Sequence, residues 1–176
     1  ALESENIHIR GLIFTDYCEE YSHWDAVKSL GAWMEEQKVP GIFGVDTRLL
    51  TQILREEGSM LGKIVPVDDD SAFEVADPGL ENQVAKVSCR DIIRYGQGDK
   101  KVVLVDCGVK HQILRNLIVR NVEVIRVPWD YDFNQLDWDG LFISNGPGDP
   151  VYCAVTVENI RKAMQIINIA FAKLHG

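Results

Sequence analysis

The sequence predicts an α/β protein with a mixed α/β N-terminal domain and, after it, the start of a doubly wound domain. Two observations support this assignment. Residues 101–106, KVVLVD, form a continuous apolar run of the kind found in parallel strands that are covered on both faces. From there on, short apolar runs alternate with segments of helical spacing in the order strand, helix, strand, loop, strand, helix, which is typical of doubly wound sheets.

A polar segment divides the chain. Residues 94–100, RYGQGDK, contain two glycines and mostly polar side chains, a composition typical of a linker. We therefore predict an N-terminal domain at residues 1–93 and a second domain at residues 101–176.

Composition limits the classes of function. The 176 residues are 46% hydrophobic, which is enough for a packed core. A formal net charge of −9 argues against a nucleic-acid partner, because phosphates are bound by clustered Lys and Arg. No apolar stretch is long enough for a membrane span, and the N-terminus lacks the pattern of a signal peptide. We therefore expect a cytoplasmic protein that does not bind membranes.

The cysteines are widely spaced, at Cys18, Cys89, Cys107 and Cys153. They form no C-x-x-C pair, and no histidine stands at metal-ligand spacing from them, so the sequence predicts no metal site. Scattered cysteines fit a reducing compartment, and a chain of this size does not need disulfides to fold.

The N-terminal domain begins with a strand and a helix. Residues 8–14, HIRGLIF, become apolar after a loose alternation, which predicts a strand. Apolar side chains then recur at helical spacing over residues 23–38, and Ser22 is in place to cap that helix. Residues 39–41, VPG, end it.

A second helix follows, with Asp46 or Thr47 as its N-cap and Gly58 at its end. We expect its apolar stripe to be buried; the stripe consists of Leu49, Leu50, Ile53 and Leu54. Three shorter segments complete the domain: a strand at 59–65, an exposed acidic connection at 66–81 and a strand at 84–87.

In the second domain the strand at 101–106 is followed by further elements in regular order: a helix at 109–121, a strand at 122–127, a strand at 140–144 and a helix at 154–164. In doubly wound sheets, ligands bind beyond the carboxyl ends of the strands. The segment LFISNGPGDP, residues 141–150, lies at such an end. We therefore examine this glycine corner as a candidate site.

The glycine corner has two interpretations. In the first, its glycines only turn the chain. In the second, the missing side chains let backbone amides approach a carbonyl oxygen, an oxyanion or a phosphate. The two prolines cannot donate, so the available amides are those of Gly146, Gly148 and Asp149. The corner is not a dinucleotide fingerprint, since a third glycine and an acidic partner are lacking.

Cys107 suggests a different chemistry. It follows a strand and precedes a helix, where partial positive charge favours a thiolate. His111 would lie near it if the helix began at about Cys107, and the two would then form a hydrolase dyad. The alternative is that Cys107 is a small buried residue in a tight turn and His111 an exposed helical one. For Cys153 the packing interpretation is favoured as well.

Four segments in order carry a resemblance to a known family: LESENIHIRGLI; SHWDAVKSLGAWMEEQKVPGIFGVDTRLLTQILREEGSMLGKI; VVLVDCGVKHQILRNL; and GLFISNGPGDP. Together they resemble the small, glutamine-hydrolysing chain of carbamoyl phosphate synthetase, over nearly all of residues 1–164. The most specific pieces are GVDTRLLT, in the family's own N-terminal domain, and SNGPGDP, in its flavodoxin-like class I glutamine amidotransferase domain.

The resemblance implies an enzyme subunit. In this family a cysteine nucleophile with His and Glu partners hydrolyses L-glutamine, and the ammonia passes to a large synthetase subunit. There it reacts with bicarbonate and ATP, with Mg as the associated metal, to form carbamoyl phosphate for pyrimidine and arginine biosynthesis. The glycine corner contacts glutamine and supplies an oxyanion donor, which assigns substrate binding to Gly146 and Gly148.

The chain departs from the family's pattern at both ends. The family continues from the helix at 154–164 into a G-x-C-x-G elbow that holds the nucleophile, and no G-x-C-x-G occurs in the 176 residues. The family's segment before ALESENIH is also absent. We therefore expect a fragment truncated before the nucleophile cysteine, with no catalytic residue, no cofactor and no glutaminase activity of its own.

Such a fragment would keep an unpaired sheet edge where the nucleophile strand belongs, and we expect poor stability or aggregation from it. The tail at 166–176 is a candidate to cover this edge as a helix. Its inward side would carry Ile166, Ile167, Ile169, Ala170 and Leu174.

Three hypotheses for function follow. The first is the glutaminase subunit of carbamoyl phosphate synthetase. The second is a catalytically inactive chain that still binds the large subunit. The third is an independent hydrolase based on Cys107 and His111.

Overall fold

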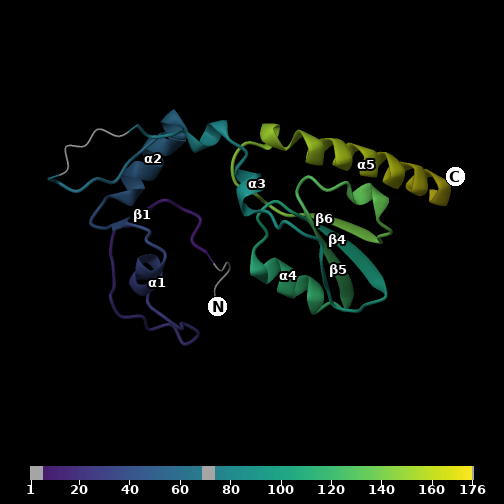
Figure 1. Ribbon diagram of the computed structural model, residues 1–176, viewed down its shortest axis with the longest axis horizontal. Helices are drawn as coiled ribbons and strands as arrows, with labels where there is room; N and C mark the ends of the chain where they lie inside the picture. The colour runs from purple at the N-terminus through teal and green to yellow at the C-terminus, as the bar shows by residue number, and fades with distance from the viewer. Residues whose placement is uncertain (1–5, 69–73, 176) are drawn as a thin grey trace. The chain divides into compact units, whose positions relative to one another are not determined.

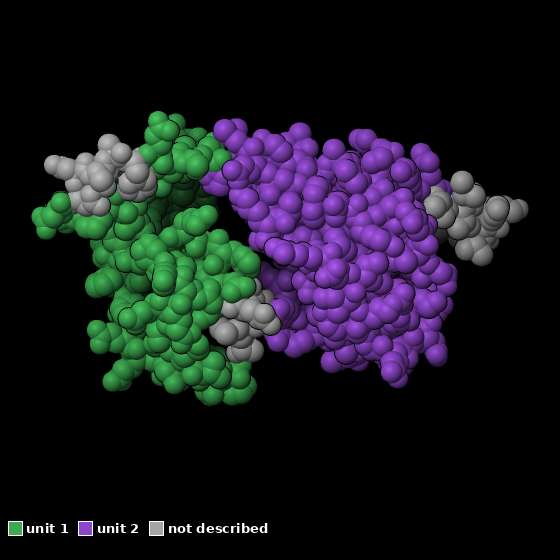
Figure 2. Space-filling view, viewed as in Figure 1, with its two compact units in different colours: residues 1–77 green, residues 78–176 purple. Residues whose placement is uncertain are grey.

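The computed structural model describes residues 6–68 and 74–175, with the side chains of the last helix described as far as Gln165. The chain forms two compact units, Ala1–Asp77 and Pro78–Gly176, shown in two colours in Figure 2. The division falls before the linker that we predicted at 94–100. That segment lies inside unit 2, because strands occupy both of its ends.

Unit 1 contains a small parallel sheet and two helices (Figure 1). Strand β1 (Leu12–Ile13) pairs with β2 (Gly41–Ile42), so the strand predicted at 8–14 is reduced to two residues. The helices are α1 (Leu30–Glu36) and α2 (Thr47–Glu57). The strand predicted at 59–65 was wrong, because these residues are irregular.

Helix α1 begins seven residues later than the sequence predicts. Ser29, not Ser22, is its N-cap, and the Ser29 hydroxyl accepts a hydrogen bond from the Ala32 amide at 3.2 Å. The earlier residues have helical spacing, but Trp24 is 90% exposed and Val27 73% exposed. Their apolar side chains therefore gain no burial from a helical conformation, and packing is the main source of helix stability in proteins.

Helix α2 begins and ends where the sequence predicts. Asp46 is its N-cap and accepts a hydrogen bond from the Leu49 amide at 2.9 Å, while Gly58 ends it at a φ of 85°. Thr47, the alternative cap, shares a hydrogen bond with the Thr15 hydroxyl instead. The expectation of a buried stripe was wrong, since Leu49 is 53% exposed and α2 has no buried residue.

We expect Asp46→Ala to lower the free energy of unfolding by about 1 kcal/mol, because the Leu49 amide loses its capping acceptor. Asp46→Asn keeps an acceptor oxygen and serves as the control. Urea unfolding followed by far-ultraviolet circular dichroism measures both variants. A stability for Asp46→Ala equal to that of the wild type would contradict the capping role.

The acidic connection predicted at 66–81 is irregular and mostly exposed where the structure describes it, and residues 69–73 lie outside the described residues. It ends at the 3-10 turn η1 (Pro78–Leu80). The strand predicted at 84–87 was wrong: these residues belong to helix α3 (Gln83–Val87). The Asn82 side chain caps this helix by accepting from the Ala85 amide at 2.9 Å.

Unit 2 is built on a four-stranded sheet with the order β3-β5-β4-β6. Three strands are parallel and match the predictions closely: β4 (Lys100–Asp106), β5 (Val122–Pro128) and β6 (Gly140–Ile143). Strand β3 (Ile93–Tyr95), which the sequence analysis missed, pairs antiparallel with β5. The order second, first, third among the parallel strands is that of flavodoxin-like sheets.

Helices cover both faces of this sheet (Figure 1). Helix α4 (His111–Ile118) packs on Leu104 and Val124, and helix α5 (Ala154–His175) packs on the face that carries Val103 and Val105. Two 3-10 turns, η2 (Phe133–Gln135) and η3 (Pro150–Cys153), complete the unit. Neighbouring residues of β4 thus point into opposite cores, which explains its continuous apolar run and confirms the doubly wound prediction.

Strand β6 lies at one edge of the sheet and pairs with β4 alone among the described residues, so the predicted unpaired edge is present. Its Phe142 and Ile143 side chains are exposed. The predicted tail helix continues α5 to His175, but the side chains that we expected to cover the edge lie outside the described residues. No helix in the described part of the chain is both long and apolar enough to cross a membrane.

Candidate functional site

The glycine corner, residues 145–150, lies at the topological switch point of the sheet. It follows β6, and the turn from β4 to α4 follows the neighbouring strand β4, so the two loops leave the same end of the sheet. In flavodoxin-like sheets this point, between the first and third strands, is where ligands bind. A cavity of about 180 Å³ opens here, lined by the corner, the start of α5, Val84 and Cys107.

Both glycines of the corner are required by geometry. A Cβ at Gly146 would lie 2.3 Å from the carbonyl oxygen of Cys107 and 3.0 Å from Val84 Cγ2. Gly148 has a φ of 78°, and a Cβ there would lie 3.2 Å from Gln83 Cβ. The turn from β4 and helix α3 therefore hold the corner from two directions.

The amides of the corner are available to a ligand. Gly146 and Gly148 are exposed, and among the described residues neither donates a hydrogen bond from its backbone N–H. Two free N–H groups at glycines of a fixed turn can bind a carbonyl or carboxylate oxygen, or an oxyanion. The geometry thus accommodates both interpretations of the corner, since the glycines turn the chain and leave donors exposed.

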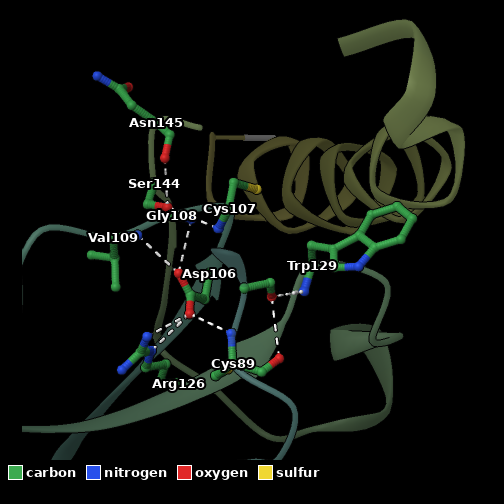
Figure 3. Close-up of polar contacts among 10 residues, drawn as sticks. Cys89, Asp106, Cys107, Gly108, Val109, Arg126, Trp129, Ser144 and Asn145 are labelled. Atoms are coloured by element: carbon green, nitrogen blue, oxygen red, sulfur yellow. Dashed lines mark hydrogen bonds and ion pairs between the residues drawn. The ribbon is translucent and has the colours of Figure 1, made fainter. Parts of the chain in front are cut away.

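Asp106, which the sequence analysis did not select, organises the turn beside the corner (Figure 3). Its Oδ1 accepts hydrogen bonds of 2.9 Å from the amides of Gly108 and Val109. Its Oδ2 accepts from the Cys89 amide at 2.7 Å and from Arg126 Nε and Nη2 at 2.9 and 2.6 Å. The available sequence signal was weak: a carboxylate at the end of a buried strand, two residues before a glycine.

The Asp106 carboxylate is fully buried and ionised. Burial alone would raise its pKa, but the hydrogen bonds from two turn amides, the Arg126 guanidinium and the Cys89 amide outweigh burial and hold the pKa below its usual range. The carboxylate therefore stays charged at neutral pH and fixes the turn electrostatically.

Ser144 connects this turn to the corner (Figure 3). Its hydroxyl accepts a hydrogen bond from the buried Cys107 amide at 2.9 Å and donates one to the carbonyl oxygen of Asn145 at 3.0 Å. Ser144 itself is buried. Sequence periodicity gave no signal for this contact, because it joins residues 37 positions apart.

Helix α3 is a second contributor that the sequence analysis missed. Gln83 and Val84 contact the corner, and Asn82 Nδ2 donates a hydrogen bond of 2.9 Å to the carbonyl oxygen of Tyr152 beyond it. Helix α3 was unpredictable as a wall of the site because its short sequence, QVAKV, reads as an alternating strand.

The structure does not support the proposed dyad of Cys107 and His111. Helix α4 begins at His111 with Lys110 as its N-cap, so Cys107 is not at a helix N-terminus as the dyad required. Burial, with Cys153 and Asp106 nearby, raises the pKa of the Cys107 thiol to about 11. Cys153 is also buried in the core, and burial raises its pKa. Both cysteines thus pack as the alternative interpretation expected.

We expect iodoacetamide at pH 7.5 to label Cys18, which is exposed, and to leave Cys107 and Cys153 unlabelled in the native chain. The thiolate is the reactive form, and its population at Cys107 is small when the pKa is about 11. Peptide mass spectrometry measures each site, and labelling in urea is the control for complete reaction. If Cys107 were labelled in the native chain as fast as Cys18, the result would contradict this prediction and support the Cys107-His111 hypothesis.

Among the described residues, no group of three or more His, Cys, Asp or Glu side chains is placed to hold a metal ion. The corner therefore stands as the candidate site, with backbone donors as its functional groups and Asp106, Ser144 and α3 as its support.

Comparison with known proteins gives two matches to protein families. Residues 1–64 match the carbamoyl-phosphate synthase small chain, CPSase domain, and residues 103–171 match glutamine amidotransferase class-I. The second match contains the turn after β4, the glycine corner and most of α5. The first lies entirely within unit 1, and α3 lies between the two matches.

Individual relatives agree with these matches. Human "Carbamoyl-phosphate synthase [ammonia], mitochondrial" is 46% identical over 165 residues, which cover 93% of this chain and 11% of that protein. The "Carbamoyl phosphate synthase arginine-specific small chain" of Eremothecium gossypii is 43% identical, over 93% of this chain and 43% of that protein. The "Multifunctional protein pyr1-3" of Dictyostelium discoideum is 44% identical, over 93% of this chain and 8% of that protein.

The chain thus spans less than half the length of each of these relatives, while the similarity extends over most of its own residues. The two family matches follow in the order that the sequence motifs predicted, and the second falls on the flavodoxin-like unit. The chain belongs to the carbamoyl-phosphate synthase small-chain family, and its residues 103–171 form a class-I glutamine amidotransferase segment.

Proposed function

We propose that the glycine corner binds L-glutamine, with the amides of Gly146 and Gly148 as donors to its oxygen atoms. The observation that carries this proposal is the pair of free N–H groups at the switch point of the sheet. Membership of residues 103–171 in the glutamine amidotransferase family supports glutamine as the ligand. In hydrolysis such donors act on the negative charge of the tetrahedral intermediate, where removal of one typically costs ~10²- to 10³-fold in rate.

In the wider enzyme, this glutamine site serves the synthesis of carbamoyl phosphate. We propose that ammonia from glutamine passes to a large synthetase subunit, where ATP and Mg would be bound. The similarity to an arginine-specific small chain and to the multifunctional protein pyr1-3 supports a role in arginine or pyrimidine biosynthesis.

These 176 residues bind glutamine without hydrolysing it in our proposal. Hydrolysis by this family needs a cysteine activated as a thiolate, and the environments of the thiols near the corner disfavour the thiolate. Cys107 and Cys153 are buried with raised pKa values, and the pKa of Cys89 is raised to about 11, first by burial and then by Asp106.

A second candidate is a chain that binds the large subunit and has no part in glutamine chemistry. The human relative favours it, because the nitrogen source in its name is ammonia. The two candidates differ in one property of this chain, namely whether the corner recognises glutamine.

Isothermal titration calorimetry of the chain with L-glutamine tests the proposal, with D-glutamine and L-asparagine as matched controls of handedness and length. We expect saturable binding of one L-glutamine and at least tenfold weaker binding of the controls. Absence of L-glutamine binding would reject the glutamine site and leave the second candidate. An ammonia-release assay on the same sample tests inactivity, and release above the rate in buffer would contradict it.

A further inference from the structure

The hydroxyl of Ser144 joins the ends of two neighbouring strands. It accepts from the Cys107 amide after β4 and donates to the carbonyl oxygen of Asn145 after β6. The backbone amide of Ser144 donates to the carbonyl oxygen of Val105 at 3.1 Å, so the residue continues the ladder between the strands. Because Ser144 is buried, water does not readily replace its hydroxyl as the partner of the Cys107 amide.

The position of Cys107 in turn determines where the corner can lie. Its carbonyl oxygen approaches Gly146 so closely that a Cβ on Gly146 would lie 2.3 Å away. The next residue, Gly108, has a φ of 120°, and a Cβ there would lie 3.4 Å from Pro147 Cδ. The turn and the corner are therefore in contact along two residues each.

Asp106 fixes only part of this turn. Its carboxylate accepts from the amides of Gly108 and Val109, whereas the amide of Cys107, the residue in contact with Gly146, donates to Ser144. The polar contact that aligns Cys107 with the corner is thus made by Ser144.

We propose that Ser144 is a positioning residue that holds the Gly146 and Gly148 amides in the orientation that binds substrate. The part of this inference that concerns glutamine rests on the proposed function. Ser144 does not itself donate to substrate in this proposal, because its hydroxyl proton is directed to Asn145. Loss of the hydroxyl leaves the Cys107 amide without its acceptor, and the turn is then free to shift against the corner.

Ser88 provides a matched control in the same unit. Its hydroxyl also accepts from a backbone amide, that of Trp129 at 3.0 Å, and donates to the carbonyl oxygen of the next residue, Cys89, at 3.3 Å. The bonding pattern is the same as that of Ser144, but it joins the end of α3 to the residue after β5 and not to the corner. Ser88→Ala therefore removes an equivalent hydroxyl whose own hydrogen bonds do not reach the corner.

The experiment compares Ser144→Ala, Ser144→Thr and Ser88→Ala by ¹⁵N relaxation and by titration with L-glutamine. We expect the order parameters of the Gly146 and Gly148 amides to fall from about 0.85 to below about 0.6 in Ser144→Ala only. We also expect its Kd for L-glutamine to rise about tenfold, with less than a twofold change in the other two variants. Ser144→Cys, which keeps the volume but offers a weak acceptor, replaces Ser144→Ala if that variant does not fold.

Each outcome separates the two proposals. Unchanged order parameters in Ser144→Ala and Ser144→Cys overturn the positioning role, whatever the affinity. A more mobile corner with an unchanged Kd for L-glutamine overturns the claim that positioning by Ser144 matters for glutamine binding. If the wild type does not bind glutamine but Ser144→Ala alone loosens the corner, the proposed function fails and the positioning role stands.

Discussion

We expect Arg126→Leu to lower the free energy of unfolding of unit 2 by about 3–5 kcal/mol, because the substitution leaves a buried carboxylate without its countercharge. Asp106 is fully buried, and Arg126 donates two hydrogen bonds to its Oδ2. The three backbone amides that also donate to this carboxylate cannot replace a full positive charge. Urea unfolding of the wild type and the variant measures the difference.

The matched control is the exposed ion pair between Lys101 and Asp137, in which Lys101 Nζ lies 3.1 Å from Asp137 Oδ2. Asp137→Ala removes one partner of that pair, and we expect a midpoint of unfolding close to that of the wild type, because exposed ion pairs contribute little. If Arg126→Leu and Asp137→Ala had equal free energies of unfolding, the buried Asp106 carboxylate would not need Arg126 as its countercharge.

The same carboxylate predicts acid sensitivity. Because the pKa of Asp106 is lower in the folded chain than in the unfolded one, its contribution to stability is present above the unfolded pKa of about 4 and is lost as the pH falls through the folded value. In Asp106→Asn this part of the pH dependence disappears. Thermal unfolding between about pH 6 and pH 3 compares the two chains, and parallel curves would contradict the prediction.

We expect Gly146→Ala to abolish the proposed glutamine binding and to lower the free energy of unfolding by about 1–3 kcal/mol. The new Cβ would meet the Cys107 carbonyl oxygen at 2.3 Å and the Cys107 Cβ at 2.9 Å, so the corner and the turn must move apart. The carbonyl oxygen belongs to the Cys107 backbone and the Cys107 Cβ is bonded directly to that backbone, so rotation of a side chain cannot relieve the contact. Calorimetric titration with L-glutamine and urea unfolding measure the two effects.

Gly140→Ala is the control for this substitution. Gly140 lies in β6 of the same unit, and a Cβ there would make ordinary contact with Val102 Cγ2 at 3.6 Å. We expect its glutamine affinity and stability to remain close to those of the wild type. If Gly146→Ala behaved like Gly140→Ala, the corner would not have the tight geometry described above.

Sequence patterns predicted the parallel strands of unit 2 and helix α2 of unit 1 well, but the strands and helix α1 of unit 1 poorly, for a physical reason. The runs KVVLVD and VEVIRV place apolar side chains on both faces of the sheet because helices cover both faces, and few other environments favour such runs. The sequence prediction placed the start of helix α1 too early. Helical spacing also occurs around Trp24 and Val27, where a helix would bury neither side chain. Spacing shows that a helix is compatible with a segment, whereas packing decides whether it forms.

The site was predictable only where turn chemistry revealed it. Gly146 and Gly148 stand out because two glycines and two prolines crowd one corner after a strand. The local sequence marks Asp106 only as a carboxylate at the end of a strand, and it gives no signal for Ser144. Their importance comes from contacts with Arg126 and Cys107, 20 and 37 residues away. Long-range contacts of this kind appear only when the chain is folded.

Titration of the ¹⁵N-glycine-labelled chain with L-glutamine tests the central claim most directly. The chain has 14 glycines, and the loss of one signal in Gly146→Ala and in Gly148→Ala assigns the two amides. We expect these two signals to shift in a saturable way with L-glutamine and to remain unchanged with D-glutamine. Saturable shifts confined to other glycines, or no shifts at any concentration, would contradict the assignment of the corner as the glutamine site.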